Sequence, residues 1–311
     1  MKFGFSELLV ILFLVVIGTF HFSRAENLPL ARTEEAIPVV DTFRDLDLEA
    51  RGIFVYDLLL KKPLYEKMAD TPLPLASLTK LVTVITAADI LPKNAIVTIA
   101  RKHLKEEGDQ GLFADEKWNL KNIFDFSLVS SSNDGIAAIV DTARAVISSV
   151  DSNANGARSF VDFMNEKSKK LGLTSMRFIN ETGLDVESFD QTGGYGSARD
   201  VAMLMTWIVE NEPELLEATP YERLTLVSES QKVHNIQNTN EIIGHIPSLI
   251  GSKTGYTDRA GGNLVIVFDM GFAHPIVVSV LGSSIEGRFS DAEKLIAATF
   301  LYFEKNPELT F

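Results

Sequence analysis

The feature that most constrains the chain is a serine and a lysine, Ser77 and Lys80, at the head of an apolar run. Pro74 precedes the serine and apolar residues recur as far as Ile90, which predicts a helix with Ser77 in its first turn. On a helix, residues three apart share one face. A lysine whose pKa is lowered by burial or by a nearby positive charge can take the proton of a serine hydroxyl, and helix N–H groups suit an oxyanion. The pair predicts a serine nucleophile with a lysine base, although a capping serine beside an exposed lysine gives the same short pattern.

Composition limits the partners of the chain. Its 311 residues suffice for one large domain or two small ones. A net charge of −13 argues against nucleic acid, because phosphate binding needs a basic face. The chain has no cysteine, which excludes disulfides, thiolate nucleophiles and cysteine metal sites.

The pattern of the N-terminus is typical of a targeting signal. Lys2 precedes an apolar run from Leu8 to Phe20, and small residues follow at Ser23 and Ala25. This run is shorter than the about 20 residues that a membrane span needs. Residues 1–25 therefore predict a signal peptide or an N-terminal membrane anchor and an exported protein of the cell envelope, and residues 26–47 predict a linker.

The apolar patterns predict an α/β (α+β) fold. Strands are expected at both ends of the chain, with helices between them and one closing helix over residues 289–303. This order indicates an antiparallel sheet whose first and last strands pair, flanked by helices, with an inserted helical subdomain. In the predicted domain, residues 48–311, the sheet part covers 48–75 and 245–311 and the helical part covers about 76–244.

Two further short motifs follow Ser77 and Lys80 along the chain. One is Ser131-Ser132-Asn133, between two helical patterns, and the other is Lys253-Thr254-Gly255, at the expected end of a strand. Alone, the first could be a helix cap and the second a hairpin turn with an exposed lysine. Together and in this order the three motifs are specific.

The set S-x-x-K, S-x-N and K-T-G resembles that of the β-lactamases and penicillin-binding proteins. The chain is most similar to the low-molecular-mass D-alanyl-D-alanine carboxypeptidases, which implies a β-lactamase/DD-peptidase-like fold. Other stretches that resemble this family are Met164-Asn165, Asn180, Gly183-Leu184-Asp185 and Ser197-Ala198-Arg199-Asp200. The similarity covers roughly Leu48 to Phe303.

The resemblance implies catalytic roles for four residues. Ser77 would attack the carbonyl of the penultimate D-alanine, form an acyl-enzyme and release the terminal D-alanine. Lys80 would take the hydroxyl proton, and Ser131 would relay a proton toward the leaving amine. Asn133 would hydrogen-bond the substrate amide and Lys80.

The resemblance also implies binding roles. Lys253 would keep Lys80 neutral and attract the substrate carboxylate, which Thr254 would bind. The N–H groups of Ser77 and Tyr256 would form the oxyanion hole, Gly255 would belong to the same binding site, and Arg288 would lie near the carboxylate. The expected partners are peptidoglycan stem peptides ending in D-Ala-D-Ala and β-lactam antibiotics, with membrane contact only through the N-terminal segment. No metal or other cofactor is expected.

Sequence motifs also bear on several other functions. A DD-endopeptidase acting on peptidoglycan cross-links would use the same residues. A class A-like β-lactamase needs a deacylating glutamate in a Glu-x-x-x-Asn pattern, which neither Glu166 nor Glu181 provides. The chain has no Gly-x-Ser-x-Gly elbow for a Ser-His-Asp hydrolase and no His-Glu-x-x-His for a zinc peptidase. A binding module without activity is disfavoured because the nucleophile and base are present.

Overall fold

The computed structural model describes residues 39–108, 111–150, 158–186 and 191–309. Val40–Phe311 form one compact unit. The predicted signal peptide or anchor, residues 1–25, lies outside the described residues. Among the residues that are described, no helix is both long and apolar enough to cross a bilayer.

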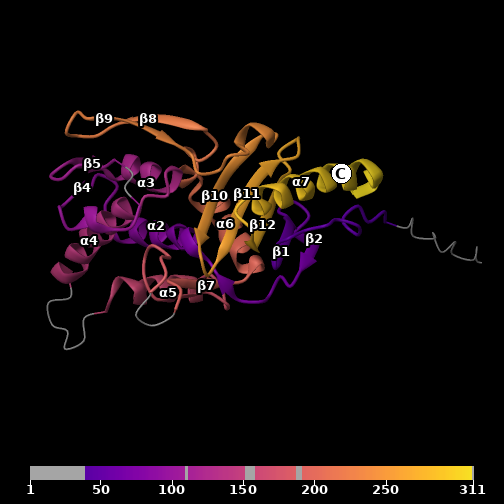
Figure 1. Cartoon of the computed structure of the whole chain (residues 1–311), viewed down its shortest axis with the longest axis horizontal. Coiled ribbons are helices and arrows are strands. Elements are labelled where there is room, and N and C mark those ends of the chain that lie inside the picture. Colours follow the sequence, from indigo (N-terminus) through magenta and orange to yellow (C-terminus); the bar gives the residue numbers. More distant parts are fainter. Residues whose placement is uncertain (1–38, 109–110, 151–157, 187–190, 310–311) are drawn as a thin grey trace, which may run out of the picture. The chain divides into compact units, whose positions relative to one another are not determined.

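The centre of the unit is an antiparallel sheet of five strands in the order β10-β11-β12-β1-β2 (Figure 1). The first strand of the chain pairs with the last, as Gly52 lies opposite Leu281, so the predicted topology is confirmed. The strands are β1 (Gly52–Asp57), β2 (Lys62–Lys67), β10 (Leu249–Thr257), β11 (Gly261–Asp269) and β12 (Pro275–Ser283).

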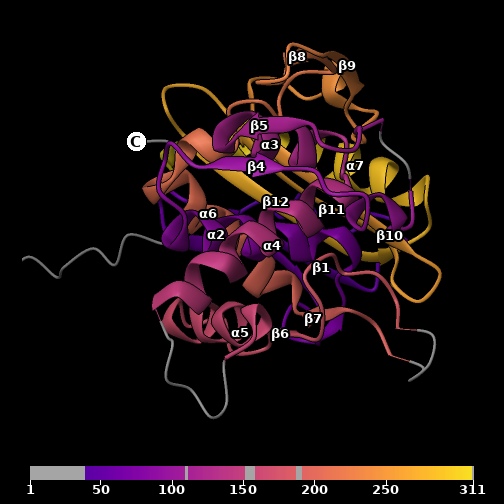
Figure 2. The same ribbon diagram turned by 90° about the vertical axis from the view of Figure 1, so that its left-hand side faces the viewer.

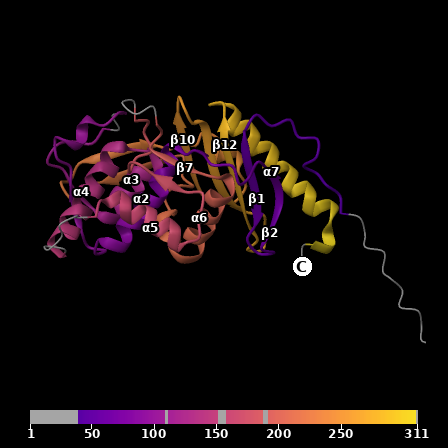
Figure 3. The same ribbon diagram turned by 90° about the horizontal axis from the view of Figure 1, so that it is seen from below.

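Both faces of this sheet are buried. Successive side chains of a strand point to opposite faces. On β11, Leu264 and Ile266 belong to the apolar cluster shared with α7 (Gly287–Lys305), whereas Val265 and Val267 belong to the cluster shared with α6 (Ala198–Asn211). The strand is therefore almost continuously apolar, as expected of a strand covered on both faces. Figure 3 shows the sheet between α6 and α7.

The helical part stands beside the β10 edge of the sheet in Figure 1, and in Figure 2 it faces the viewer. Local capping explains where its helices begin: Asn119 accepts from Asn122 N, and Ser159 forms a capping box with Asp162. The predicted helical range needs one correction, because α6 lies within it and packs on β12 and β1 of the sheet. The helices of this part are α2 (Thr79–Ile90), α3 (Leu120–Val129), α4 (Asn133–Val150) and α5 (Phe160–Lys170).

Short strands also interrupt the predicted helical range. The pair β8 (Arg223–Val227) and β9 (Val233–Gln237) forms a hairpin that the sequence analysis missed. It is tied to the helical part by a buried pair, His234 Nε2 at 2.7 Å from Glu116 Oε1. The other short strands are β3 (Leu73–Pro74), β6 (Arg177–Phe178) and β7 (Gly194–Gly196) in one sheet, and β4 (Ile96–Thr98) and β5 (Lys117–Asn119) in another.

The end of the predicted linker belongs to the folded unit. Phe43 is buried and stacks on Tyr65 with ring centroids 5.4 Å apart. Val40 N donates to Asn306 Oδ1 at 2.8 Å. Apolar burial and these contacts attach residues 40–47 to β2 and α7, so the predicted boundary at residue 48 lies too far along the chain.

Candidate active site

Ser77 lies in a single 3-10 turn, η1 (Ala76–Leu78), directly before α2 rather than inside that helix. Ala76 has φ +48°, a left-handed conformation that a residue with a side chain rarely adopts. Two contacts hold the turn. Asn263 Nδ2 donates to Pro74 O at 2.9 Å, and Gly183 packs so closely that a Cβ there would lie 1.9 Å from Ala76 O. The nucleophile therefore sits on a strained, tightly supported turn, half-buried and ahead of a helix N-terminus.

Lys80 is fully buried and reaches back to this serine. Its Nζ lies 2.7 Å from Ser77 Oγ and 2.9 Å from Thr182 O. Burial lowers the pKa of Lys80 to about 7, against a smaller opposing effect of Glu106. A large fraction of Lys80 is therefore an uncharged amine near neutral pH, and it lies within hydrogen-bond distance of the hydroxyl whose proton it can accept.

The carbonyl that fixes Lys80 comes from a loop shaped by Asn180. Asn180 Oδ1 accepts Gly183 N at 2.8 Å, and its Nδ2 donates to Leu184 O at 2.8 Å. Thr83 Oγ1, one turn along α2 from the lysine, donates to Glu181 O at 2.6 Å. Sequence analysis missed the role of Thr182, because a backbone carbonyl carries no residue-type signal.

Lys253 forms a second lysine–serine pair. Its Nζ donates to Ser131 Oγ and to Thr254 O, both at 2.9 Å. Ser131, in the short connection between α3 and α4, has φ +59°. The structure thus joins the second and third motifs, which lie 122 residues apart in the sequence. The third motif also lies against the first, because a Cβ on Gly255 would be 3.2 Å from Ser77 N.

Burial is the first cause of the pKa shift of both lysines. The pKa of Lys80 is lowered by burial, and the pKa of Lys253 is lowered well below its usual value by burial first and then by the charges of Lys80 and Arg288. The charges of the two lysines are thus coupled, and the effect of Lys253 on the protonation of Lys80 stays a prediction.

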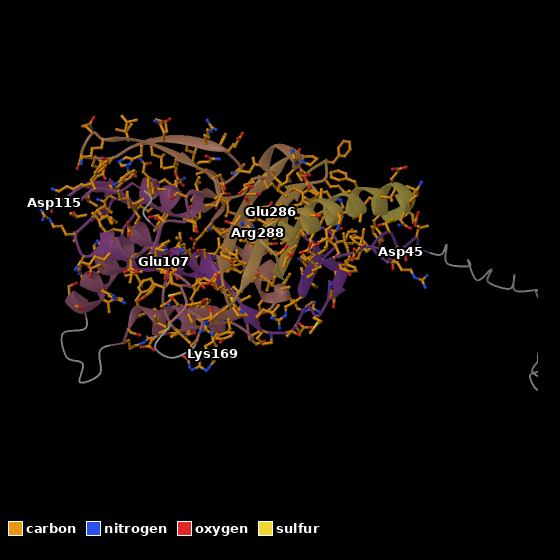
Figure 4. All side chains as sticks on the ribbon, in the orientation of Figure 1. Asp45, Glu107, Asp115, Lys169, Glu286 and Arg288 are labelled. Carbon is orange, nitrogen blue, oxygen red and sulfur yellow. The ribbon has the colours of Figure 1, made fainter. Side chains whose placement is uncertain are left out.

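Asn133 makes a different contact from the one predicted. Its Nδ2 donates to Glu107 O at 2.6 Å, whereas Lys80 uses Thr182 O. Asn133 Oδ1 is buried and has no hydrogen-bond partner among the described residues. A buried acceptor of this kind is costly unless a ligand donates to it. Figure 4 labels Glu107 in the helical part of the molecule.

The Lys253-Thr254-Gly255 motif lies inside β10 and does not end in a turn, since the strand continues to Thr257. Thr254 Oγ1 lies 2.6 Å from Thr239 Oγ1. A Cβ on Gly255 would lie 2.9 Å from Leu75 O and 3.2 Å from Ser77 N. Glycine therefore allows this strand to pass against the turn that carries the nucleophile.

Tyr256 lies in β10, and Arg288 contacts the same strand. Tyr256 is 44% exposed, and its hydroxyl donates to Asp258 Oδ1 at 3.1 Å. Arg288, on the first turn of α7, is buried and donates from Nη1 to Gly255 O at 2.9 Å; Figure 4 labels it beside the sheet. Arg288 thus holds β10 at Gly255 and adds positive charge behind Lys253.

The geometry suits acyl transfer. The Ser77 hydroxyl contacts the buried amine of Lys80, and the Ser131 hydroxyl contacts Lys253. Strand β10 lies close to the backbone N–H of Ser77 at Gly255. Across the described parts of the chain, no group of three or more His, Asp, Glu or Cys side chains could hold a metal ion.

Comparison with known proteins identifies the family. The model of the peptidase S11 family, described as D-alanyl-D-alanine carboxypeptidase, matches residues 39–284. The chain belongs to this family. This places it among the penicillin-binding DD-peptidases, as the motifs predicted.

Similar members of the S11 family carry related names. The D-alanyl-D-alanine carboxypeptidase DacC of Escherichia coli is 30% identical over 282 residues, which are 85% of this chain and 65% of the relative. DacF of Bacillus subtilis is 27% identical over 269 residues, with the same two shares. A D-alanyl-D-alanine endopeptidase of Pseudomonas aeruginosa is 28% identical over 230 residues, 71% of this chain and 67% of that protein. The chain spans 65% of the length of the first two relatives.

Solved structures agree with the fold predicted. Penicillin-binding protein D2 of Listeria monocytogenes, crystallised with ampicillin, has a TM-score of 0.67 and 27% identity, and the match covers 82% of this chain and 99% of that one. A mutant of the Streptomyces K15 DD-transpeptidase has a TM-score of 0.70 with 21% identity, over 82% of this chain and 99% of its own. The β-lactamase/DD-peptidase-like fold is confirmed.

Proposed function

We propose that the chain is a serine-type D-Ala-D-Ala carboxypeptidase that removes the terminal D-alanine from peptidoglycan stem peptides. The observation that carries the proposal is the contact of Lys80 Nζ with Ser77 Oγ at 2.7 Å, with the lysine buried and its pKa lowered to about 7. Membership of the S11 family and the names of the relatives support the same substrate class.

The reaction proceeds through an acyl-enzyme on Ser77. Lys80 accepts the hydroxyl proton as Ser77 Oγ bonds to the carbonyl carbon of the penultimate D-alanine. The C–N bond then breaks, and the terminal D-alanine leaves with a proton relayed through Ser131. Water cleaves the ester in the second half of the reaction and restores the serine. Asn133 accepts the substrate amide N–H at its unpaired Oδ1.

Substrate binding falls to β10 and its neighbours. Lys253 and Thr254 bind the terminal carboxylate, and Arg288 adds positive charge behind them. The N–H groups of Ser77 and Tyr256 stabilise the oxyanion, with Gly255 giving them room. β-Lactams would acylate the same serine; ampicillin is bound in the crystal structure of the Listeria relative.

The cellular setting is part of the proposal. Residues 1–25 would direct export or anchor the protein, the next residues up to about 39 would link that segment to the catalytic domain, and the enzyme would act in the cell envelope. Contact with the membrane would come only through the N-terminal segment.

Endopeptidase activity on cross-links is the second candidate, because relatives named D-alanyl-D-alanine endopeptidase match 71% of this chain. β-Lactamase activity has less support. Glu166 is half-buried and paired with Arg158 and Lys170, and Glu181 is paired with Arg144, so neither is poised beside Ser77.

The test measures product release from two substrates by chromatography. We expect the purified protein to release D-alanine from a stem pentapeptide, and the Ser77→Ala variant to release none. A cross-linked dimer separates the two candidates: cleavage of the dimer with no release of D-alanine from the pentapeptide would replace carboxypeptidase with endopeptidase. A folded protein that cleaves neither would contradict the proposal.

A further inference from the structure

A cavity of about 500 Å³ opens beside Thr254 of β10. It is bounded by the end of β9 and by the chain that follows, from Gln237 to Glu241. Thr239 lines it, and Thr239 Oγ1 lies 2.6 Å from Thr254 Oγ1. The cavity therefore begins where the proposed site for the terminal carboxylate ends, and no role described above uses it.

The leaving residue of the substrate would lie next to this cavity. Under the proposed function Thr254 binds the terminal carboxylate, which is attached directly to the α-carbon that bears the side chain of the leaving residue. Ligand pockets in proteins measure about 300–1,000 Å³, and the methyl group of D-alanine would leave a cavity of this size largely empty. The cavity therefore suits a leaving residue with a longer side chain.

The wall of the cavity is held by hydrogen bonds of two buried asparagines, Asn238 and Asn240. Asn238 Oδ1 accepts Asn240 N at 2.9 Å, and Asn238 Nδ2 donates to Thr219 O at 2.8 Å. Asn240 Nδ2 donates to Ser252 Oγ on β10 at 3.0 Å. The chain around Thr239 is therefore fixed to β10, which gives a preformed cavity and lowers the entropic cost of binding there.

The charged groups of the cavity are carboxylates. Its lining consists of six described residues with three side-chain amides, one hydroxyl and two carboxylates, and none of the six is a cation. The carboxylates are those of Glu222 and Glu241, both exposed. Within the described chain, neither has an ion pair or a side-chain hydrogen bond. Unpaired carboxylates at a cavity favour an occupant with a positive charge.

Glu241 is the carboxylate whose charge reaches the substrate-binding strand. Burial lowers the pKa of Arg288, and the charge of Glu241 is the largest effect that opposes it. Arg288 in turn donates to Gly255 O on β10 at 2.9 Å. Glu222 is joined to the cavity wall through its backbone, since its carbonyl accepts Asn238 N at 2.8 Å.

We propose that this cavity binds the side chain of the leaving residue, that it accepts a C-terminal D-residue longer than D-alanine, and that Glu241 pairs with an ammonium at the end of that side chain. This inference rests on the proposed function and extends it to the preference for the leaving group. Glu241 is then a specificity-determining residue, and Thr239 marks the entrance from the carboxylate site.

The test uses three peptides that share the sequence Nα,Nε-diacetyl-L-lysyl-D-Ala and end in D-alanine, D-lysine or D-norleucine. The last two differ only in the ammonium. We expect both to be cleaved, with kcat/KM roughly three- to fivefold higher for the D-lysine peptide, the factor of one exposed ion pair, mainly through KM. Glu241→Gln should abolish that preference. Glu229→Gln is the matched control, because it removes an exposed carboxylate of the chain between β8 and β9 that does not line the cavity, and it should keep the preference.

The ratio between the D-lysine and D-norleucine peptides separates recognition from other effects. If Glu241 acted only through Arg288, Glu241→Gln would change both peptides equally and leave the ratio intact, which would overturn the inference. Equal kcat/KM for the two peptides in the wild-type protein would overturn it as well. Release of D-alanine with no cleavage of the two longer peptides would overturn the inference and leave the proposed function standing. A folded protein that cleaves none of the three would overturn the proposed function, and the inference with it.

Discussion

Two buried lysines meet at the site with matching contacts. Lys80 Nζ lies 2.7 Å from Ser77 Oγ and 2.9 Å from Thr182 O, and Lys253 Nζ lies 2.9 Å from Ser131 Oγ and from Thr254 O. Their surroundings differ. The chief charge near Lys80 is the carboxylate of Glu106, whereas the charges near Lys253 are Lys80 and Arg288.

This difference suggests that Lys80 and Lys253 have different roles. An amine whose pKa lies near neutrality can exchange protons during turnover, which suits Lys80 to the base role. Lys253 lies near the Arg288 guanidinium and near Lys80, whose charges lower its pKa. A bound anion would relieve this positive potential, which suits Lys253 to the substrate carboxylate. The same contacts thus serve chemistry in one pair and recognition in the other.

The largest effect that separates the two lysines is expected from Lys80→Met. Loss of the base should slow acylation by benzylpenicillin about 10³-fold. The measurement is the rate of adduct formation by rapid-quench mass spectrometry. Lys294→Met, which removes an exposed lysine on α7, is the control. A rate within a few-fold of wild type in Lys80→Met would transfer the base role to another group.

Lys253→Met is expected to have a smaller effect that depends on the substrate. Loss of a charge-assisted contact to the carboxylate should lower kcat/KM roughly 30-fold for a peptide acid, mainly through KM. For the corresponding peptide amide, which lacks that carboxylate, the loss should be only a few-fold. Equal losses for acid and amide would show that Lys253 acts on the chemistry and not on recognition.

The pH dependence of acylation tests the pKa of the base. Lys80 must be unprotonated, and its pKa is about 7, so the rate should fall as pH decreases through 7, by about tenfold per unit below it. Above pH 8 the limb should be flat. The measurement is the benzylpenicillin acylation rate from pH 5.5 to 9. A rate that kept rising toward pH 10 would mean that Lys80 keeps the ordinary pKa of a lysine.

The smallest effect concerns the support of β10. Thr239→Val removes the hydroxyl 2.6 Å from Thr254 Oγ1 without changing the shape of the side chain. Loss of one hydrogen bond, about 1 kcal/mol, should raise KM about fivefold. Thr225→Val, on the β8–β9 hairpin, removes an exposed hydroxyl bond and should leave KM unchanged.

The sequence predicted the contact of Ser77 with Lys80 because residues three apart on a helix share a face, and the 3-10 turn that carries Ser77 leads directly into α2. The pair of Lys253 and Ser131 has no such local basis, and it was predicted only through the resemblance of the whole motif set. Thr182 was missed because its contribution is a backbone carbonyl placed by Asn180. Thr239 was missed for a related reason, since its partner Thr254 lies on a different element.

In the fold, too, features set by local sequence were predicted and features set by distant contacts were missed. The strands at both ends of the chain and the closing helix over residues 289–303, which is α7, were predicted because local pattern determines them. The β8–β9 hairpin was missed. Its side chains are mostly polar, and it is anchored by His234 and Glu116, which lie 118 residues apart. The resemblance predicted that Asn133 contacts Lys80. In the structure Asn133 donates to the backbone carbonyl of Glu107, and this contact depends on the path of the chain rather than on residue type.

The central claim is that Ser77 is the nucleophile, and its most direct test is intact-protein mass spectrometry after exposure to benzylpenicillin, followed by peptide mapping. The account predicts one covalent adduct on the peptide that contains Ser77, and none in Ser77→Ala. The structure offers Ser131 as a second hydroxyl beside a lysine, so Ser131→Ala is the matched control and should still form the adduct on Ser77. An adduct on any other residue, or an undiminished adduct in Ser77→Ala, would contradict the account.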